Sequence, residues 1–153
     1  MRLSEFLRSD FVLPHLEARD VEGVVRELSA RAGSAGVAPE ELVSQKLLER
    51  ERAHSTVMGS GLAIPHATVP GLADPVIGVA LAREPIAFGP AEADPVRVFV
   101  VLLSPPGRER EHVKILARIC RLMRHEDFLD RLEEAEDDEG IIDVIQSIDA
   151  QHA

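Results

Sequence analysis

The hydrophobic positions divide the chain into a helical part, a central part of short apolar runs, and a second helical part. After a short leading segment, apolar residues recur every three or four positions, which predicts a helix that Asp20 caps and Gly33 stops. Pro39 opens a second predicted helix. The apolar stripes of the two helices are Val21, Val24, Val25, Leu28 and Ala32 in the first, and Leu42, Val43, Leu47 and Leu48 in the second.

The central part has the pattern of buried strands. Three apolar runs bounded by Gly and Pro predict strands at residues 62–64, 75–82 and 96–103 of one sheet. The run from Val96 to Leu103 is broken only by Arg97, which predicts a central strand covered by helices on both faces. In the proline-rich connection before it, Ile86–Phe88 is a candidate for a short edge strand.

Helical periodicity returns after the loop at residues 104–107. One predicted helix has a stripe facing the sheet, and two further helices are predicted, one near residues 126–134 and one near the C-terminus. The acidic stretch from Glu133 to Glu139 is expected to be a solvated junction between them. The stripes are His112, Leu116, Ile119 and Met123 in the first helix, and Ile141, Ile142, Ile145 and Ile148 in the last. The order of elements predicts an α/β fold.

Composition narrows the class of protein. A chain of 153 residues fits a single domain, 1–153, and its net charge of −10, with basic residues interspersed among acids, argues against a nucleic-acid partner. The one cysteine, Cys120, cannot form an internal disulfide and is expected to be buried in a helix, in keeping with a cytoplasmic location. No run approaches the ~20 apolar residues that cross a bilayer, so direct membrane insertion is not expected.

Candidate chemistry centres on residues 59–67, Gly-Ser-Gly-Leu-Ala-Ile-Pro-His-Ala. Pro65 should end the preceding strand, so His66 is expected just past a strand end, where a partly exposed imidazole suits a nucleophile or proton carrier. An incidental loop histidine is an equal alternative. His112, near the start of a helix, is either a satisfied core histidine or a second group converging on His66. The six histidines lack metal-ligand spacing, so no metal site is expected, and hydrolase and nucleotide-loop motifs are absent from the sequence.

Residues 48–67 resemble the signature of a known family. An Arg-Glu pair at Arg50 and Glu51, a Ser-Thr pair at Ser55 and Thr56, and then Gly-x-Gly-hydrophobic-Ala-hydrophobic-Pro-His follow in order. This pattern resembles the fructose/mannitol class of EIIA proteins of the phosphoenolpyruvate:sugar phosphotransferase system, including its nitrogen-regulatory branch. The likeness continues through residues 85–88, 94–96 and 111–112, so it covers nearly the whole chain.

The resemblance implies roles for particular residues. His66 matches the family's phosphoryl-accepting histidine, Arg50 its active-site arginine, and His112 its second active-site histidine. Ser55 and Thr56 are either phosphate-binding hydroxyls or structural residues. Glu51 either braces Arg50 through an ion pair or is a solvated helix residue. His54, close to the motif, adds an imidazole with no assigned role.

The resemblance also implies a fold and a function. The implied fold is a three-layer α/β sandwich with a mixed β-sheet between helices. The implied function is that of a phosphotransferase component without a cofactor, which takes a phosphoryl group from an HPr-like phosphocarrier and passes it to an EIIB component for sugar uptake. The alternative is a regulatory protein of the nitrogen type, whose phosphorylation state decides which target proteins it binds. A weaker alternative, a binding domain without transfer chemistry, is opposed by the joint presence of Arg50, His66 and His112.

Overall fold

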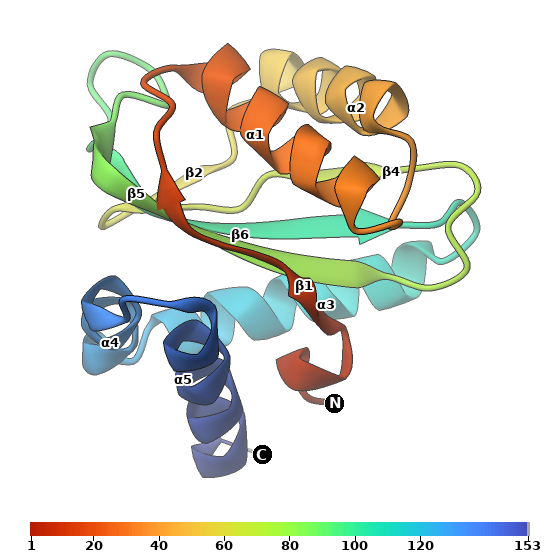
Figure 1. Ribbon diagram of the computed structural model, residues 1–153. Coiled ribbons are helices and arrows are strands. Elements are labelled where there is room, and N and C mark those ends of the chain that lie inside the picture. Colours follow the sequence, from red (N-terminus) through yellow and green to blue (C-terminus); the bar gives the residue numbers. More distant parts are fainter. Residues whose placement is uncertain (153) are drawn as a thin grey trace.

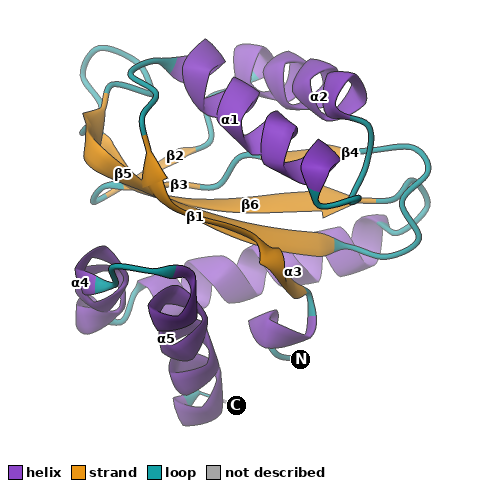
Figure 2. Ribbon diagram, viewed as in Figure 1, coloured by secondary structure: helices purple, strands orange, loops and turns teal. Residues whose placement is uncertain are grey.

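Three layers make up the computed structural model, which describes residues 1–152 apart from the side chain of Glu126. Figures 1 and 2 show a β-sheet with α1 and α2 on one face and α3, α4 and α5 on the other. This arrangement confirms the predicted three-layer α/β sandwich. The elements are the 3-10 turn η1 (Leu3–Glu5), β1 (Leu7–Leu16), α1 (Val21–Ser34), α2 (Glu40–Ala53), β2 (Val57–Gly59), β3 (Leu62–Ala63), β4 (His66–Thr68), β5 (Val76–Ile86), β6 (Val96–Ser104), α3 (Glu109–Met123), α4 (Glu126–Glu134) and α5 (Asp138–Gln151).

The sheet is mixed, and β6 lies at its centre. The strand order is β1-β5-β6-β3-β2, and β4 pairs with β6 beyond the end of β3. β1 runs parallel to β5, and both β3 and β4 run parallel to β6, whereas β5 and β6 are antiparallel. Every residue of β6 except Arg97 is buried, as the nearly continuous apolar run predicted.

The strand β1 lies in the segment from which the sequence predicted no element. Its apolar residues Phe11, Val12 and Leu13 follow three polar residues and precede Pro14, a pattern too short and irregular to be recognised as a strand. Pro14 is tolerated because β1 is an edge strand, and an edge strand has no hydrogen-bonded neighbour on its outer side. A Cβ atom on Gly78 of β5 would lie 2.6 Å from the Phe11 ring, so glycine is needed there for β1 to pack closely.

The first helix begins as predicted, but it continues one residue past Gly33, and the glycine that stops it, Gly36, lies three residues after the predicted one. The Asp20 side chain accepts a hydrogen bond from the Gly23 amide at 2.7 Å, which caps α1. The helix passes through Gly33, and Gly36, with φ of +72°, is the residue that takes the left-handed conformation. The amides of Gly36 and Val37 then bond to the carbonyls of Gly33 and Ala32, as in a Schellman motif.

The glycine-rich motif forms a hairpin followed by an interrupted strand. Ser60 and Gly61 both have positive φ, so they form the two-residue turn between β2 and β3. Pro65 interrupts the ladder for only one step, because its carbonyl still accepts the Leu102 amide at 3.0 Å and the chain stays extended. His66 thus follows the end of β3, as predicted, but it is also the first residue of a further short strand, β4, which was not predicted.

Two other expectations about the strands and helices need correction. Residue Ile86 belongs to β5 and pairs with Val96 after a register shift, so there is no separate edge strand at residues 86–88. The buried face of α3 consists of Ile115, Arg118, Ile119 and Leu122, about one residue away from the predicted stripe. His112 and Cys120 are consequently only half-buried, at the flank of the helix.

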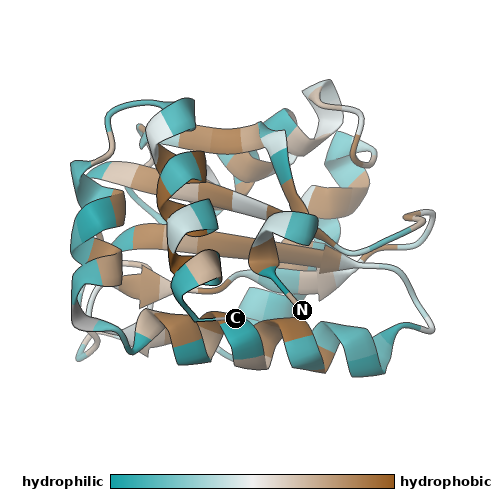
Figure 3. Ribbon diagram, turned by 90° about the horizontal axis from the view of Figure 1, so that it is seen from below, coloured by the Kyte–Doolittle hydropathy of each residue, from teal (hydrophilic) through white to brown (hydrophobic). Residues whose placement is uncertain are grey.

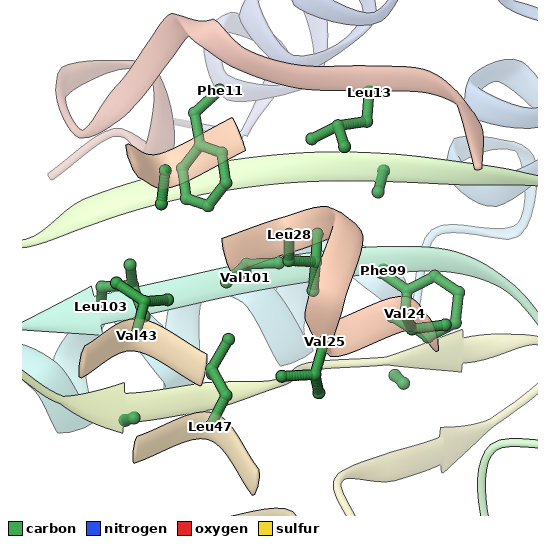
Figure 4. Close-up of a cluster of buried hydrophobic side chains, with 14 of the residues drawn as sticks. Phe11, Leu13, Val24, Val25, Leu28, Val43, Leu47, Phe99, Val101 and Leu103 are labelled. Atoms are coloured by element: carbon green, nitrogen blue, oxygen red, sulfur yellow. The ribbon is translucent and has the colours of Figure 1, made fainter. Parts of the chain in front are cut away.

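Apolar side chains fill both spaces between the layers. The cluster under α1 and α2 includes Phe11, Leu28, Leu47 and Phe99, drawn with its neighbours in Figure 4. A second cluster lies between the sheet and α3, α4 and α5, and Figure 3 views the molecule from that side, with hydrophilic segments along the outward face of α3. Among residues 1–152, no helix is long and apolar enough to span a membrane.

A buried ion pair joins the two ends of the chain. The Asp149 carboxylate of α5 is fully buried and accepts the backbone amides of Leu3 and Ser4 at 3.0 and 2.8 Å. Arg118 of α3 donates to the same carboxylate at 3.2 Å and to the His152 carbonyl at 2.6 Å. Figures 1 and 3 both show the N- and C-termini close together on the α3–α5 side.

Candidate functional site

The orientation of His66 is fixed by its own backbone. Its Nδ1 atom lies 2.7 Å from the carbonyl oxygen of Ile64. Because a carbonyl can only accept, this bond requires a proton on Nδ1, and the neutral ring then carries its lone pair on Nε2. His66 is in register with Leu102, whose side chain belongs to the cluster on the α3 side, so the imidazole faces α3.

His112 approaches from α3 and meets His66. The centroids of the two rings are 5.4 Å apart and the ring planes are tilted by 58°. The Nδ1 atom of His112 lies 2.7 Å from the hydroxyl oxygen of Ser104, the last residue of β6. The structure thus brings together the two histidines that the sequence singled out, and it adds Ser104, which the sequence analysis missed.

The surroundings lower the pKa of both histidines below the ordinary value of 6.5. For His66, burial is the largest cause and the charge of Arg50 adds to it, against opposing effects of the Ile64 bond and Glu51. For His112, burial is again the largest cause, followed by His66 and then Arg50. Both rings are therefore neutral near pH 7, and neutrality gives His66 a free lone pair on Nε2.

Arg50 lies near the end of α2, which covers the other face of the sheet, and its charge acts on both histidines. Its guanidinium donates to the carbonyl of His54 at 2.7 Å, which fixes the side chain across the last turn of the helix. In the described part of the chain it makes no ion pair, and this leaves further guanidinium donors for an anion.

The Ser-Thr pair has two different environments. Thr56 is buried, and its hydroxyl and amide both donate to the carboxylate of Glu51, at 2.6 and 2.7 Å. Glu51 thereby anchors the segment after α2 and does not brace Arg50. Ser55 is exposed, and its hydroxyl oxygen accepts the Val57 amide at 3.2 Å, so its own proton stays available to a ligand. The exposed His54 contributes only its backbone carbonyl.

Ser104 had a weak signal in the sequence. It is the single polar residue between the apolar run of β6 and the Pro105-Pro106 turn, where a strand ends. A side chain at such a place is well positioned to reach a neighbouring helix, but the sequence alone does not show which helix residue lies opposite. In residues 1–152, no three His, Cys, Asp or Glu side chains gather in a way that could hold a metal ion.

The lowered pKa values predict how stability depends on pH. Since both imidazoles bind protons more weakly in the folded state, the unfolded chain takes up protons first, and the free energy of unfolding falls as the pH drops below about 6.5. The loss is complete once the pH passes the lowered folded-state values. We expect NMR titration to give both histidines a pKa below that of free histidine. Urea unfolding at about pH 7.5 and pH 5.5 should show a smaller loss for the His66→Gln/His112→Gln variant than for the unmodified chain. An ordinary or raised pKa at either ring would contradict the burial argument.

Comparisons with known proteins agree on one family. The fold and the site define an α/β sandwich protein with two neighbouring imidazoles, one on β4 and one on α3, whose pKa values the charge of an arginine lowers. The sequence model of the family "Phosphoenolpyruvate-dependent sugar phosphotransferase system, EIIA 2" matches residues 5–148. The chain belongs to this EIIA family, as its resemblance to the fructose/mannitol class predicted.

One relative and two solved structures are similar to this chain over nearly its whole length. A nitrogen regulatory protein of Bradyrhizobium diazoefficiens is 33% identical over 146 residues, which are 95% of each chain. The crystal structure of IIA-Ntr from Neisseria meningitidis matches with a TM-score of 0.85 and 22% identity, covering 94% of this chain and 98% of that one. In a complex of enzyme IIAMTL with phosphorylated enzyme IIBMTL from Escherichia coli, the matching chain has a TM-score of 0.78 and 18% identity, covering 93% and 99%. The two solved structures share the fold.

Proposed function

We propose that the chain is a phosphocarrier that accepts a phosphoryl group on Nε2 of His66. The hydrogen bond from Nδ1 of His66 to the Ile64 carbonyl is the observation that carries this proposal, because it leaves Nε2 as the nucleophilic atom of a neutral ring. The same carbonyl stabilises the positive charge that the ring gains once Nε2 is phosphorylated.

The transfer step needs in-line positioning of the phosphoryl group and neutralisation of the charge on its oxygens, and side chains of this site can supply both. The Nε2 lone pair of His66 forms a bond to phosphorus while the donor's N–P bond breaks, and that electron pair stays on the donor imidazole. The exchange requires no net proton. Arg50 neutralises charge on the phosphoryl oxygens through its free guanidinium donors, and His112 donates a hydrogen bond to the same group. Ser55 has a hydroxyl proton to offer, whereas that of Thr56 is already donated to Glu51.

The partners that fit this chemistry are an HPr-like phosphocarrier as donor and an EIIB component as acceptor. The family description supports coupling to sugar uptake, and a structural neighbour is a complex of an enzyme IIA with a phosphorylated enzyme IIB. Because the family match runs from residue 5 to 148, we propose that residues 1–153 act as one phosphocarrier domain in the cytoplasm.

A regulatory role is the second candidate function. The relative that covers 95% of both chains is a nitrogen regulatory protein, which favours a phosphorylation-dependent choice of target proteins. Pull-downs with phosphorylated and unphosphorylated protein separate the two candidates. Capture of a kinase or an ion transporter by only the unphosphorylated form supports regulation, and transfer of the phosphoryl group to EIIB supports uptake.

Intact-mass spectrometry tests the phosphoryl acceptor directly. The chain is incubated with phosphoenolpyruvate, enzyme I and HPr, and we expect an acid-labile gain of one phosphoryl group. His66→Ala should show no gain, while His15→Ala, which removes an exposed histidine of β1, should behave like the unmodified chain. Full labelling of His66→Ala, or no labelling of the unmodified chain by proven upstream proteins, would overturn the proposal.

A further inference from the structure

The hydroxyl of Ser104 is the one side chain that forms a hydrogen bond with the His112 ring in the described residues. Ser104 is 1% exposed, and its backbone is fixed because its carbonyl accepts the Val69 amide at 2.8 Å. The side chain points to the α3 side of the sheet, since Ser104 lies two residues beyond Leu102 on the same strand face. A rigid strand end thus holds a hydroxyl against a histidine at the start of a helix.

The direction of this hydrogen bond decides where His112 carries its proton. A hydroxyl and a neutral imidazole nitrogen can each be donor or acceptor. If Nδ1 of His112 donated to Ser104, the buried hydroxyl proton of Ser104 would need another acceptor, and among residues 1–152 no second partner is found. A buried donor without a partner costs free energy, so the hydroxyl donates to Nδ1.

We infer that Ser104 is a positioning residue of the site: by donating to Nδ1, its hydroxyl holds neutral His112 in the tautomer that carries a proton on Nε2. This inference rests on the proposed phosphocarrier function. His66 and His112 then present opposite groups, a lone pair on Nε2 of His66 and an N–H on Nε2 of His112. The first attacks phosphorus, and the second donates to an oxygen of the transferred group. If Nδ1 of His112 also donated to a carbonyl oxygen, as Nδ1 of His66 does, both Nε2 atoms would carry lone pairs and the site would lack this N–H donor.

The first arm of the test reads the tautomer without any phosphoryl transfer. Nitrogen-15 NMR of the histidine rings above pH 7 distinguishes protonated from unprotonated ring nitrogens. We expect a proton on Nδ1 of His66 and on Nε2 of His112 in the unmodified chain. In Ser104→Ala, the His112 signals should shift toward a mixture of tautomers, while those of His66 keep their pattern. A proton on Nδ1 of His112 in the unmodified chain would overturn the inference.

The second arm measures the single-turnover rate of transfer from phospho-HPr. Ser104→Ala is expected to slow labelling of His66 by about tenfold, as removal of an outer partner of a functional histidine typically does, and Ser104→Thr should restore most of the rate. Ser29→Ala is the matched control, because Ser29 is an equally buried serine of α1 whose hydroxyl has no partner in the described residues. Equal rates for Ser104→Ala and Ser29→Ala would refute the positioning role.

The two arms separate failure of this inference from failure of the phosphocarrier proposal. Absence of labelling in the unmodified chain removes the proposed function, whereas the NMR arm still decides the tautomer. Circular dichroism and amide NMR spectra of each variant confirm that it is folded. If Ser104→Thr does not fit its buried position, the tautomer measured in the unmodified chain remains decisive.

Discussion

Replacing Asp149 by alanine is expected to lower the free energy of unfolding by about 3–5 kcal/mol, measured by urea denaturation. The substitution leaves the guanidinium of Arg118 buried without its counter-charge, since the two side chains are 5% and 0% exposed. It also removes the acceptor of the Leu3 and Ser4 amides. The loss therefore combines an unpaired buried charge with two unpaired backbone donors.

The chain offers matched controls for this experiment. Asp143→Ala removes an exposed aspartate from the same helix and should change the free energy of unfolding by less than about 0.5 kcal/mol. An Asp149→Leu/Arg118→Met variant removes both charges of the ion pair, so it should unfold with a higher free energy than Asp149→Ala. Similar stabilities of Asp149→Ala and Asp143→Ala would show that the buried ion pair contributes little.

Replacing Arg50 by alanine is expected to slow phosphoryl transfer to His66 by roughly 10²–10³-fold while the chain stays folded. The positive charge of Arg50 lowers the pKa of both histidines, and in the described residues its guanidinium makes no ion pair. Since the guanidinium is only partly buried, its loss from α2 should cost little stability. Quenched-flow labelling with phospho-HPr measures the rate.

Arg52→Ala is the control for Arg50→Ala. Arg52 is an exposed arginine two residues further along α2, paired with Glu22 at 3.9 Å. Its removal should leave the rate unchanged. Arg50→Lys should restore the charge but only part of the rate, because an ammonium group lacks the planar fork of donors. If Arg50→Ala and Arg52→Ala transfer at the same rate, Arg50 has no role in the step.

Much of the fold follows from local patterns, and the departures have specific causes. The capped α1, the apolar stripe of α2 and the central β6 were predicted because period and flanking residues agree there. The strand β1 was missed because its stability comes from pairing with β5 across more than sixty residues of sequence, which no local pattern reveals. The end of α1 was misplaced because Gly33 is compatible with a helix and only Gly36 takes positive φ.

The candidate site was predictable in its parts but not in its contacts. His66, His112 and Arg50 stood out through a motif, and the structure brings the two rings together. The bond from Ser104 to His112 spans eight residues and two elements, and the bonds from Thr56 to Glu51 depend on the turn after α2. Such contacts depend on how strand ends and helix ends meet in space, so no local sequence pattern predicts them.

The meeting of the two chain ends at Asp149 also bears on how the sequence can be rearranged. Because Leu3 and Ser4 bond directly to a residue of the last helix, a short peptide linker could join the ends without crossing the sheet. New ends could then be opened in the acidic junction between α4 and α5, where residues 136 and 137 are solvent-exposed. The order of elements along the chain is thus less constrained than their arrangement in space, and a circular permutant would keep β4, β6 and the start of α3 in place.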